Sequence, residues 1–127
     1  MTPLLSVCAG GALGSGARYL VSLFATRQLP TGFAWGTLIV NVAGSFLLAL
    51  VVQLSLSSPS LSPNTRLFLT TGVMGGFTTY STFNQETLVL LQQGSPGAAL
   101  ANVLATLLAC LAAGFAGLAL ARTIAGA

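Results

Sequence analysis

Four long apolar runs, almost uninterrupted by charge, constrain this chain more than any other feature of its sequence. They cover residues 3–26, 34–56, 67–92 and 97–121, and short stretches rich in Pro, Gly, Ser and Gln separate them. The hydrocarbon core of a bilayer is about 30 Å thick and needs roughly 20 apolar residues in a helix, so each run is long enough to cross it. We therefore expect an all-α membrane protein whose residues 1–127 form a single domain of four transmembrane helices.

The composition excludes the main alternatives. Only 4% of the residues are charged, whereas soluble domains carry about 25%. A membrane β-barrel needs strands that alternate in polarity, and these runs are continuously apolar. The arginines are scattered, so no basic patch favours nucleic acid. Because the chain has no His and only one acid, Glu86, we expect neither an enzyme nor a His/Cys metal centre.

The arginines also bear on the orientation of the chain. With four spans both termini lie on one side of the membrane, and Arg66 and Arg122 fall on that side. Arg27 falls on the other side, and Arg18 lies within the first span, nearer to Arg27. The asymmetry of Lys and Arg in short loops sets orientation, and this bias is small. A chain that inserts both ways could pair with its inverted copy; the alternative is that a partner sets the orientation.

Small residues in the first run predict close helix packing. Gly10 and Gly14 form a GxxxG pair, which lets two helix backbones approach each other. Four helices with a polar interior would still leave their buried polar groups near a single layer of protein. We therefore expect an oligomer.

Asn41 lies near the middle of the second run, where a polar side chain without a partner is costly. Its amide has two donor hydrogens and an acceptor oxygen without a formal charge. That chemistry suits either a bond between helices or contact with an ion that sheds water. Thr37 and Ser45, one turn before and after Asn41, share its face and extend it into a polar stripe.

The third run contains a pair of glycines, Gly75 and Gly76, followed by a cluster of hydroxyl side chains. This is poor material for a continuous helix, and we expect a break near residues 75–79. A break frees backbone carbonyls, which a cation, water or neighbouring hydroxyls must then satisfy. After the break, Tyr80 and Phe83 are three residues apart and share a face. The positive edges of their rings would suit a small anion.

At these residues the sequence resembles the Fluc family of fluoride channels, also called CrcB, small four-helix proteins of bacterial membranes. The resemblance covers nearly the whole chain, and its specific parts are residues 10–19 (GGALGSGARY), 36–41 (GTLIVN) and 75–83 (GGFTTYSTF). It implies an antiparallel, dual-topology homodimer in the bacterial inner membrane, with two separate pores that export fluoride passively from the cytoplasm. It also implies a structural sodium ion on the two-fold axis at the broken third helices.

The resemblance assigns roles residue by residue. The matching pore positions are Asn41, Tyr80, Ser81, Thr82 and Phe83. Tyr80 stands where the family usually has a phenylalanine, and its added hydroxyl could bond the ion, bond a neighbour or narrow the path. The main-chain carbonyls of Gly75 and Thr78 match the sodium ligands, Arg18 matches an arginine near the vestibule, and Glu86 matches an acidic position.

The last helix departs further from the family. Cys110 and Gly114 stand where the family's polar track has Ser or Thr, and Thr106 lies one turn before them. We count Thr37, Thr106 and Cys110 as further pore candidates and leave the ion route at this end open.

Two other functions remain open on the residues alone. A small dual-topology multidrug antiporter needs a membrane carboxylate, which its family carries in the first helix, whereas the first run here has Arg18 and no acid. A non-transporting assembly subunit would need only the GxxxG packing and one buried asparagine. That hypothesis leaves the hydroxyls and aromatic rings after Gly76 unexplained.

Overall fold

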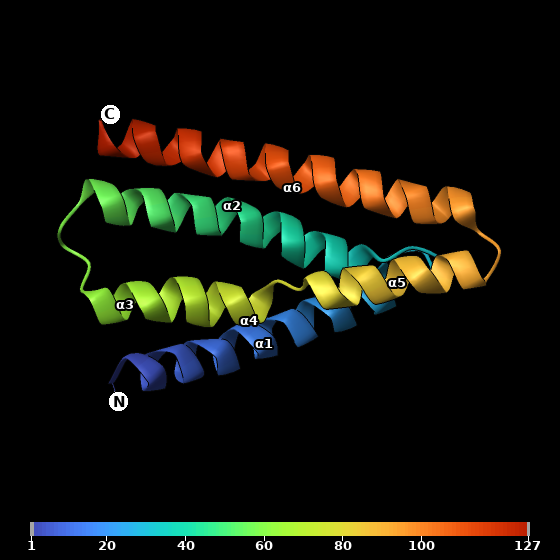
Figure 1. Cartoon of the computed structure of the whole chain (residues 1–127), viewed down its shortest axis with the longest axis horizontal. Helices are drawn as coiled ribbons and strands as arrows, with labels where there is room; N and C mark the ends of the chain where they lie inside the picture. The colour runs from blue at the N-terminus through green and yellow to red at the C-terminus, as the bar shows by residue number, and fades with distance from the viewer. Residues whose placement is uncertain (1, 127) are drawn as a thin grey trace.

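The computed structural model describes residues 2–126, and within that range the chain is helical with no strand. Three long helices carry the length and hydropathy of membrane spans, namely α1 (Thr2–Gln28), α2 (Trp35–Ser57) and α6 (Pro96–Ala125) (Figure 1). The third crossing is composite and consists of α3 (Pro63–Leu67), the π-helical segment η1 (Phe68–Met74), α4 (Gly75–Phe77) and α5 (Tyr80–Gln92). The predictions of an all-helical membrane protein and of a broken third helix are confirmed.

Figure 1 shows α2 lying alongside α6, and α1 packs against η1 and α4 of the third crossing. Both termini are at the same end of the molecule. The turns between the helices have local causes. Ser62 caps α3 by accepting a hydrogen bond from the Thr65 amide at 3.1 Å, and Pro63 starts that helix. Gly32 has φ of +97°, a conformation that favours glycine in the turn before α2.

The close contact between α1 and the third crossing depends on glycines of both segments. A Cβ atom on Gly72 would lie 2.9 Å from the Cα of Gly10, and one on Gly76 would meet the backbone oxygen of Gly11. A Cβ on Gly14 would collide with the carbonyl of Val73. Gly10 and Gly14 therefore pack as the GxxxG pattern predicted, and their partner is the third crossing of the same chain.

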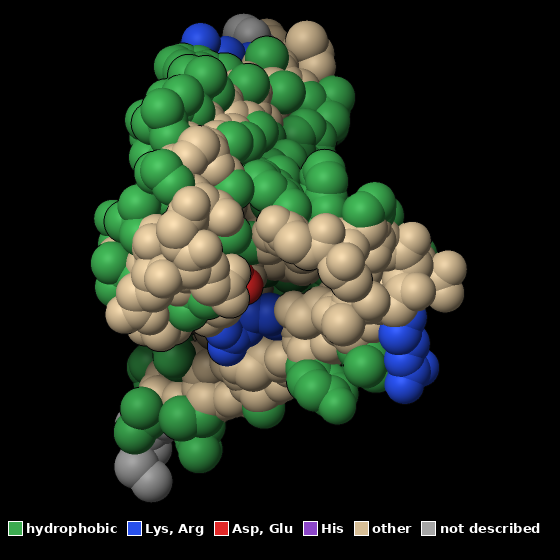
Figure 2. All heavy atoms as spheres, turned by 90° about the vertical axis from the view of Figure 1, so that its right-hand side faces the viewer, with side chains coloured by type: hydrophobic (Ala, Val, Ile, Leu, Met, Phe, Trp, Pro, Cys, Tyr) green, Lys and Arg blue, Asp and Glu red, His purple; other side chains and the backbone are tan. Residues whose placement is uncertain are grey.

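The apolar surface is large and the apolar core is small. The buried apolar side chains are Ala25, Val40, Phe83, Ala99 and Ala121. Most large exposed apolar side chains lie on α1 and α6, for example Leu13 and Phe115, and apolar atoms cover much of the surface in Figure 2. Such a surface fits contact with lipid or with further protein.

Candidate functional site at the helix break

Asn41 of α2 holds the break in the third crossing. The backbone amide of Thr79 donates to Asn41 Oδ1 at 2.8 Å, and Asn41 Nδ2 donates to the Thr79 carbonyl at 2.9 Å. Thr78 and Thr79 are both extended, with ψ of 158° and 119°. A single buried side chain therefore satisfies both backbone groups of Thr79, the residue that precedes α5 as its N-cap.

The break redirects two backbone amides away from their helical acceptors. In a continuous helix the Thr79 amide would donate to the carbonyl of Gly75, and the Thr82 amide to that of Thr78. Here the Thr79 amide donates to Asn41, and the Thr82 amide donates to the Thr79 hydroxyl at 3.2 Å, which caps α5. The carbonyls of Gly75 and Thr78 thus lose the donors that a helix would give them.

An aromatic pair follows the break. The rings of Tyr80 and Phe83 lie 5.5 Å apart at 60°, so they share a face as their spacing predicted. Phe83 is buried, whereas Tyr80 is 78% exposed. Both border a cavity of about 500 Å³ between α2, α5 and α6, the aromatic cavity, whose polar lining residues are Asn41, Ser45, Thr78, Thr79, Tyr80, Thr106 and Cys110.

A second cavity, of about 280 Å³, lies on the other side of the break. We call it the arginine cavity, because Arg18 of α1 provides its only formal charge. Thr37 and Thr82 also line it, together with Ser15, Tyr19, Ser22, Val40 and Thr79. The cavity therefore combines one cation with several hydroxyl groups.

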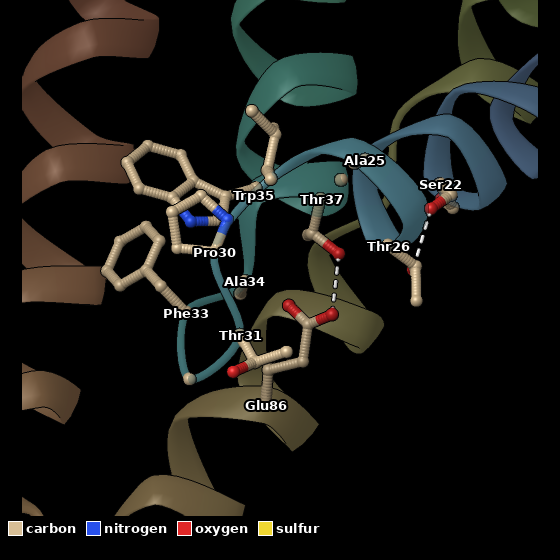
Figure 3. A pocket seen from close by; sticks show the side chains of 13 residues that line it. Ser22, Ala25, Thr26, Pro30, Thr31, Phe33, Ala34, Trp35, Thr37 and Glu86 are labelled. Atoms are coloured by element: carbon tan, nitrogen blue, oxygen red, sulfur yellow. Dashed lines mark hydrogen bonds between the residues drawn. The ribbon is translucent and has the colours of Figure 1, made fainter.

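A third cavity, of about 290 Å³, adjoins the loop between α1 and α2, and we call it the glutamate cavity. Figure 3 shows Thr37 and Glu86 facing each other across it, and the Thr37 hydroxyl donates to Glu86 Oε1 at 2.7 Å. In Figure 2 the only acid of the chain is visible in a hollow beside arginine atoms. Thr37 and Ser22 line both this cavity and the arginine cavity.

The structure brings most of the sequence candidates to these cavities. Asn41, Tyr80, Phe83, Thr106 and Cys110 meet at the aromatic cavity, and Arg18, Thr37 and Thr82 meet at the arginine cavity. Ser81 lines none of the three; it is exposed, and its hydroxyl lies 3.4 Å from that of Thr79. The Thr106 hydroxyl is buried, and within residues 2–126 it has no hydrogen-bond partner.

Sequence reasoning missed Thr79, which is central to the break. Its amide, carbonyl and hydroxyl all form the hydrogen bonds that shape the site. The available signal was a threonine three residues before Thr82 at a helix start, which is the spacing of an N-cap. The bond between Thr37 and Glu86 was also not foreseen, because it joins residues 49 positions apart.

Comparison with known proteins identifies close relatives. The family model described as CrcB-like protein, Camphor Resistance (CrcB), matches residues 5–118. A protein of Anaeromyxobacter dehalogenans (strain 2CP-1 / ATCC BAA-258), named fluoride-specific ion channel FluC, is 60% identical over 126 residues, which cover 99% of this chain and 100% of the relative. A protein of the same name from Geobacter sulfurreducens (strain ATCC 51573 / DSM 12127 / PCA) is 43% identical over 124 residues, covering 98% and 100%.

Proposed function

The chain belongs to the CrcB family, and on that premise we propose that it is a fluoride-selective ion channel through which fluoride leaves the cytoplasm passively, lowering cellular fluoride. Family membership confirms the resemblance carried by the three sequence segments. Relatives at 60% and 58% identity are named fluoride-specific ion channel FluC. The structural observation that carries the proposal is the aromatic cavity, where a ring pair and uncharged donors surround space for a small anion.

The lining of the aromatic cavity can replace the water around an anion without trapping it. The edges of Tyr80 and Phe83 carry partial positive charge. Asn41 Nδ2 has two hydrogens, of which the Thr79 carbonyl takes one, so one donor remains. The partnerless Thr106 hydroxyl is a further donor. Because none of these groups is charged, the anion gains contacts weak enough to leave again.

The arginine cavity is the proposed entrance of the fluoride pathway. A single guanidinium in a low-dielectric cleft attracts anions and raises their local concentration. Thr82 lines this cavity, and Thr79, at the break, lines both it and the aromatic cavity. An anion would therefore meet Arg18 first and the aromatic rings second.

A second, inverted copy would complete this site in the bacterial inner membrane. The balance of arginines supports dual insertion, and the small core and exposed apolar faces support association. Tyr80, 78% exposed in the single chain, would then be covered. The freed carbonyls of Gly75 and Thr78 are hard oxygen ligands of the kind that bind Na⁺ at broken helices, and Gly75 is exposed. Here they would hold the structural sodium ion between the two copies.

Efflux from liposomes tests the proposal. Purified protein is reconstituted into vesicles loaded with potassium fluoride or potassium chloride, and valinomycin is added to shunt the membrane potential. We expect fluoride efflux that requires valinomycin, and little chloride efflux. A proton-coupled antiporter would move its substrate without the shunt, and an assembly subunit would release neither halide; either result would overturn the proposal.

A further inference from the structure

The Thr37 hydroxyl bonds to Glu86, and Thr37 also lines the arginine cavity. It is 6% exposed and lines both the arginine cavity and the glutamate cavity. Its hydroxyl donates to Glu86 Oε1 at 2.7 Å, and the other carboxylate oxygen, Oε2, is buried without a hydrogen-bond partner among residues 2–126.

A threonine hydroxyl has one hydrogen and two lone pairs. While Thr37 gives its hydrogen to Glu86, its hydroxyl has only lone pairs left for any other partner, and lone pairs repel an anion. When the carboxylate takes up a proton from water on Oε1, this bond reverses. Glu86 then donates to Thr37 Oγ1, and the hydrogen of Thr37 is free to turn into the arginine cavity without movement of any heavier atom.

We infer that Glu86 is a positioning residue for anion passage: through its hydrogen bond it decides whether Thr37 offers a donor or an acceptor to the arginine cavity. The inference rests on the proposed fluoride channel and assigns regulation to the same pathway. With Glu86 ionised, the arginine cavity lacks this donor and passage is slower. With Glu86 protonated or replaced by a side chain that accepts no hydrogen bond, Thr37 donates to the anion and passage is faster.

Few other titratable groups surround the carboxylate. On α1, Arg18 and Tyr19 line the arginine cavity rather than the glutamate cavity, and Arg27 lies in the last turn without lining either. The α2 helix contains no titratable side chain. On α5 the other titratable group is Tyr80 at the aromatic cavity, and on α6 Cys110 also lies there. The response to pH expected in the experiment below is therefore assigned to Glu86.

The competing explanation is that Glu86 acts by its negative charge alone, which would repel an anion with or without Thr37. A double-mutant cycle separates the two mechanisms. Glu86→Leu removes both the charge and the acceptor, and Thr37→Val removes the hydroxyl at similar volume. Gln85→Leu, at an exposed position on the same helix, is the matched control for loss of a polar side chain.

The experiment measures fluoride efflux from liposomes between about pH 8 and about pH 5.5, above the reference value of a free carboxyl, with protein-free vesicles correcting for leak of hydrogen fluoride. We expect parent efflux to rise on acidification, and Glu86→Leu to raise it at neutral pH by about threefold to tenfold, as one added hydrogen bond would. In Glu86→Leu the response of efflux to pH should disappear. Gln85→Leu should behave as the parent.

In chains that carry Thr37→Val, the added Glu86→Leu substitution should change efflux by less than about twofold, and acidification should no longer raise it. An equal gain with and without the Thr37 hydroxyl would overturn the inference in favour of charge alone, and so would a parent without a response to pH. If Glu86→Leu fails to fold, the pH profiles of the parent and of Thr37→Val decide, because a response that persists in Thr37→Val shows that Glu86 does not act through the Thr37 hydroxyl. A parent that releases no fluoride at any pH refutes the channel itself.

Discussion

Replacing Asn41 with leucine removes both hydrogen bonds that hold Thr79 at the helix break. Leucine is close to asparagine in size, so the substitution leaves α2 packed while the Thr79 amide and carbonyl lose their partner. Both groups are part-buried, where water replaces a lost partner poorly. The Thr79 amide can then recover a partner only by donating to Gly75, which would close the break into a continuous helix.

The cost follows from these two bonds. Leaving one buried backbone group unsatisfied costs about 1–3 kcal/mol, so two such groups would cost about 2–6 kcal/mol. Partial closure of the helix recovers one bond, and we therefore expect Asn41→Leu to lower the free energy of unfolding by about 2–4 kcal/mol. Asn41→Asp with a protonated carboxyl keeps an acceptor for the Thr79 amide and an O–H donor for the Thr79 carbonyl, so it should cost less than Asn41→Leu.

Denaturant titration of the purified protein in detergent measures the loss, and liposome efflux measures its effect on transport. Gln53→Leu on the same helix is the matched control, because the Gln53 amide makes only a 3.4 Å bond to the exposed Ser57 hydroxyl. We expect Asn41→Leu to be destabilised and to lose most fluoride efflux, and Gln53→Leu to shift stability by less than about 0.5 kcal/mol. If Asn41→Leu matches Gln53→Leu in stability, Asn41 does not hold the break and this account of the site is wrong.

Three further predictions concern the pore, the orientation and the ion between the copies. Phe83→Ile should lower fluoride efflux by at least about tenfold with nearly unchanged dimer yield, since an aliphatic side chain lacks a positive ring edge. Tyr80→Phe should still conduct, and Tyr80→Ile should be impaired. If Phe83→Ile conducts like the parent, the rings serve only in packing. C-terminal reporters should be active on both sides of the membrane, and two or three lysines added to the loop 29–34 should trap one orientation and abolish activity until an inverted partner is supplied; reporters active on one side only would contradict dual insertion. Exchange of sodium for a large organic cation should dissociate the dimer during size-exclusion chromatography if the carbonyls of Gly75 and Thr78 bind Na⁺, and an unchanged elution volume would argue against that site.

Several features follow from the sequence because their causes are local. The apolar runs form the three long membrane helices and the interrupted third crossing, since length and hydropathy alone decide whether a segment suits a bilayer. The glycines of the first run pack closely because no Cβ stands between the backbones. Tyr80 and Phe83 share a face because three residues make nearly one helical turn.

The position and chemistry of the break were decided by the tertiary structure. Gly75 and Gly76 indicated a weak segment, but the extended residues are Thr78 and Thr79, because Asn41, 38 residues earlier in the chain, satisfies the Thr79 backbone from α2. A local pattern cannot contain a partner that another helix brings. The same reason explains why Thr37 and Glu86 look unrelated in the sequence and yet form a hydrogen bond, since only the packing of α2 against α5 places Thr37 Oγ1 and Glu86 Oε1 2.7 Å apart.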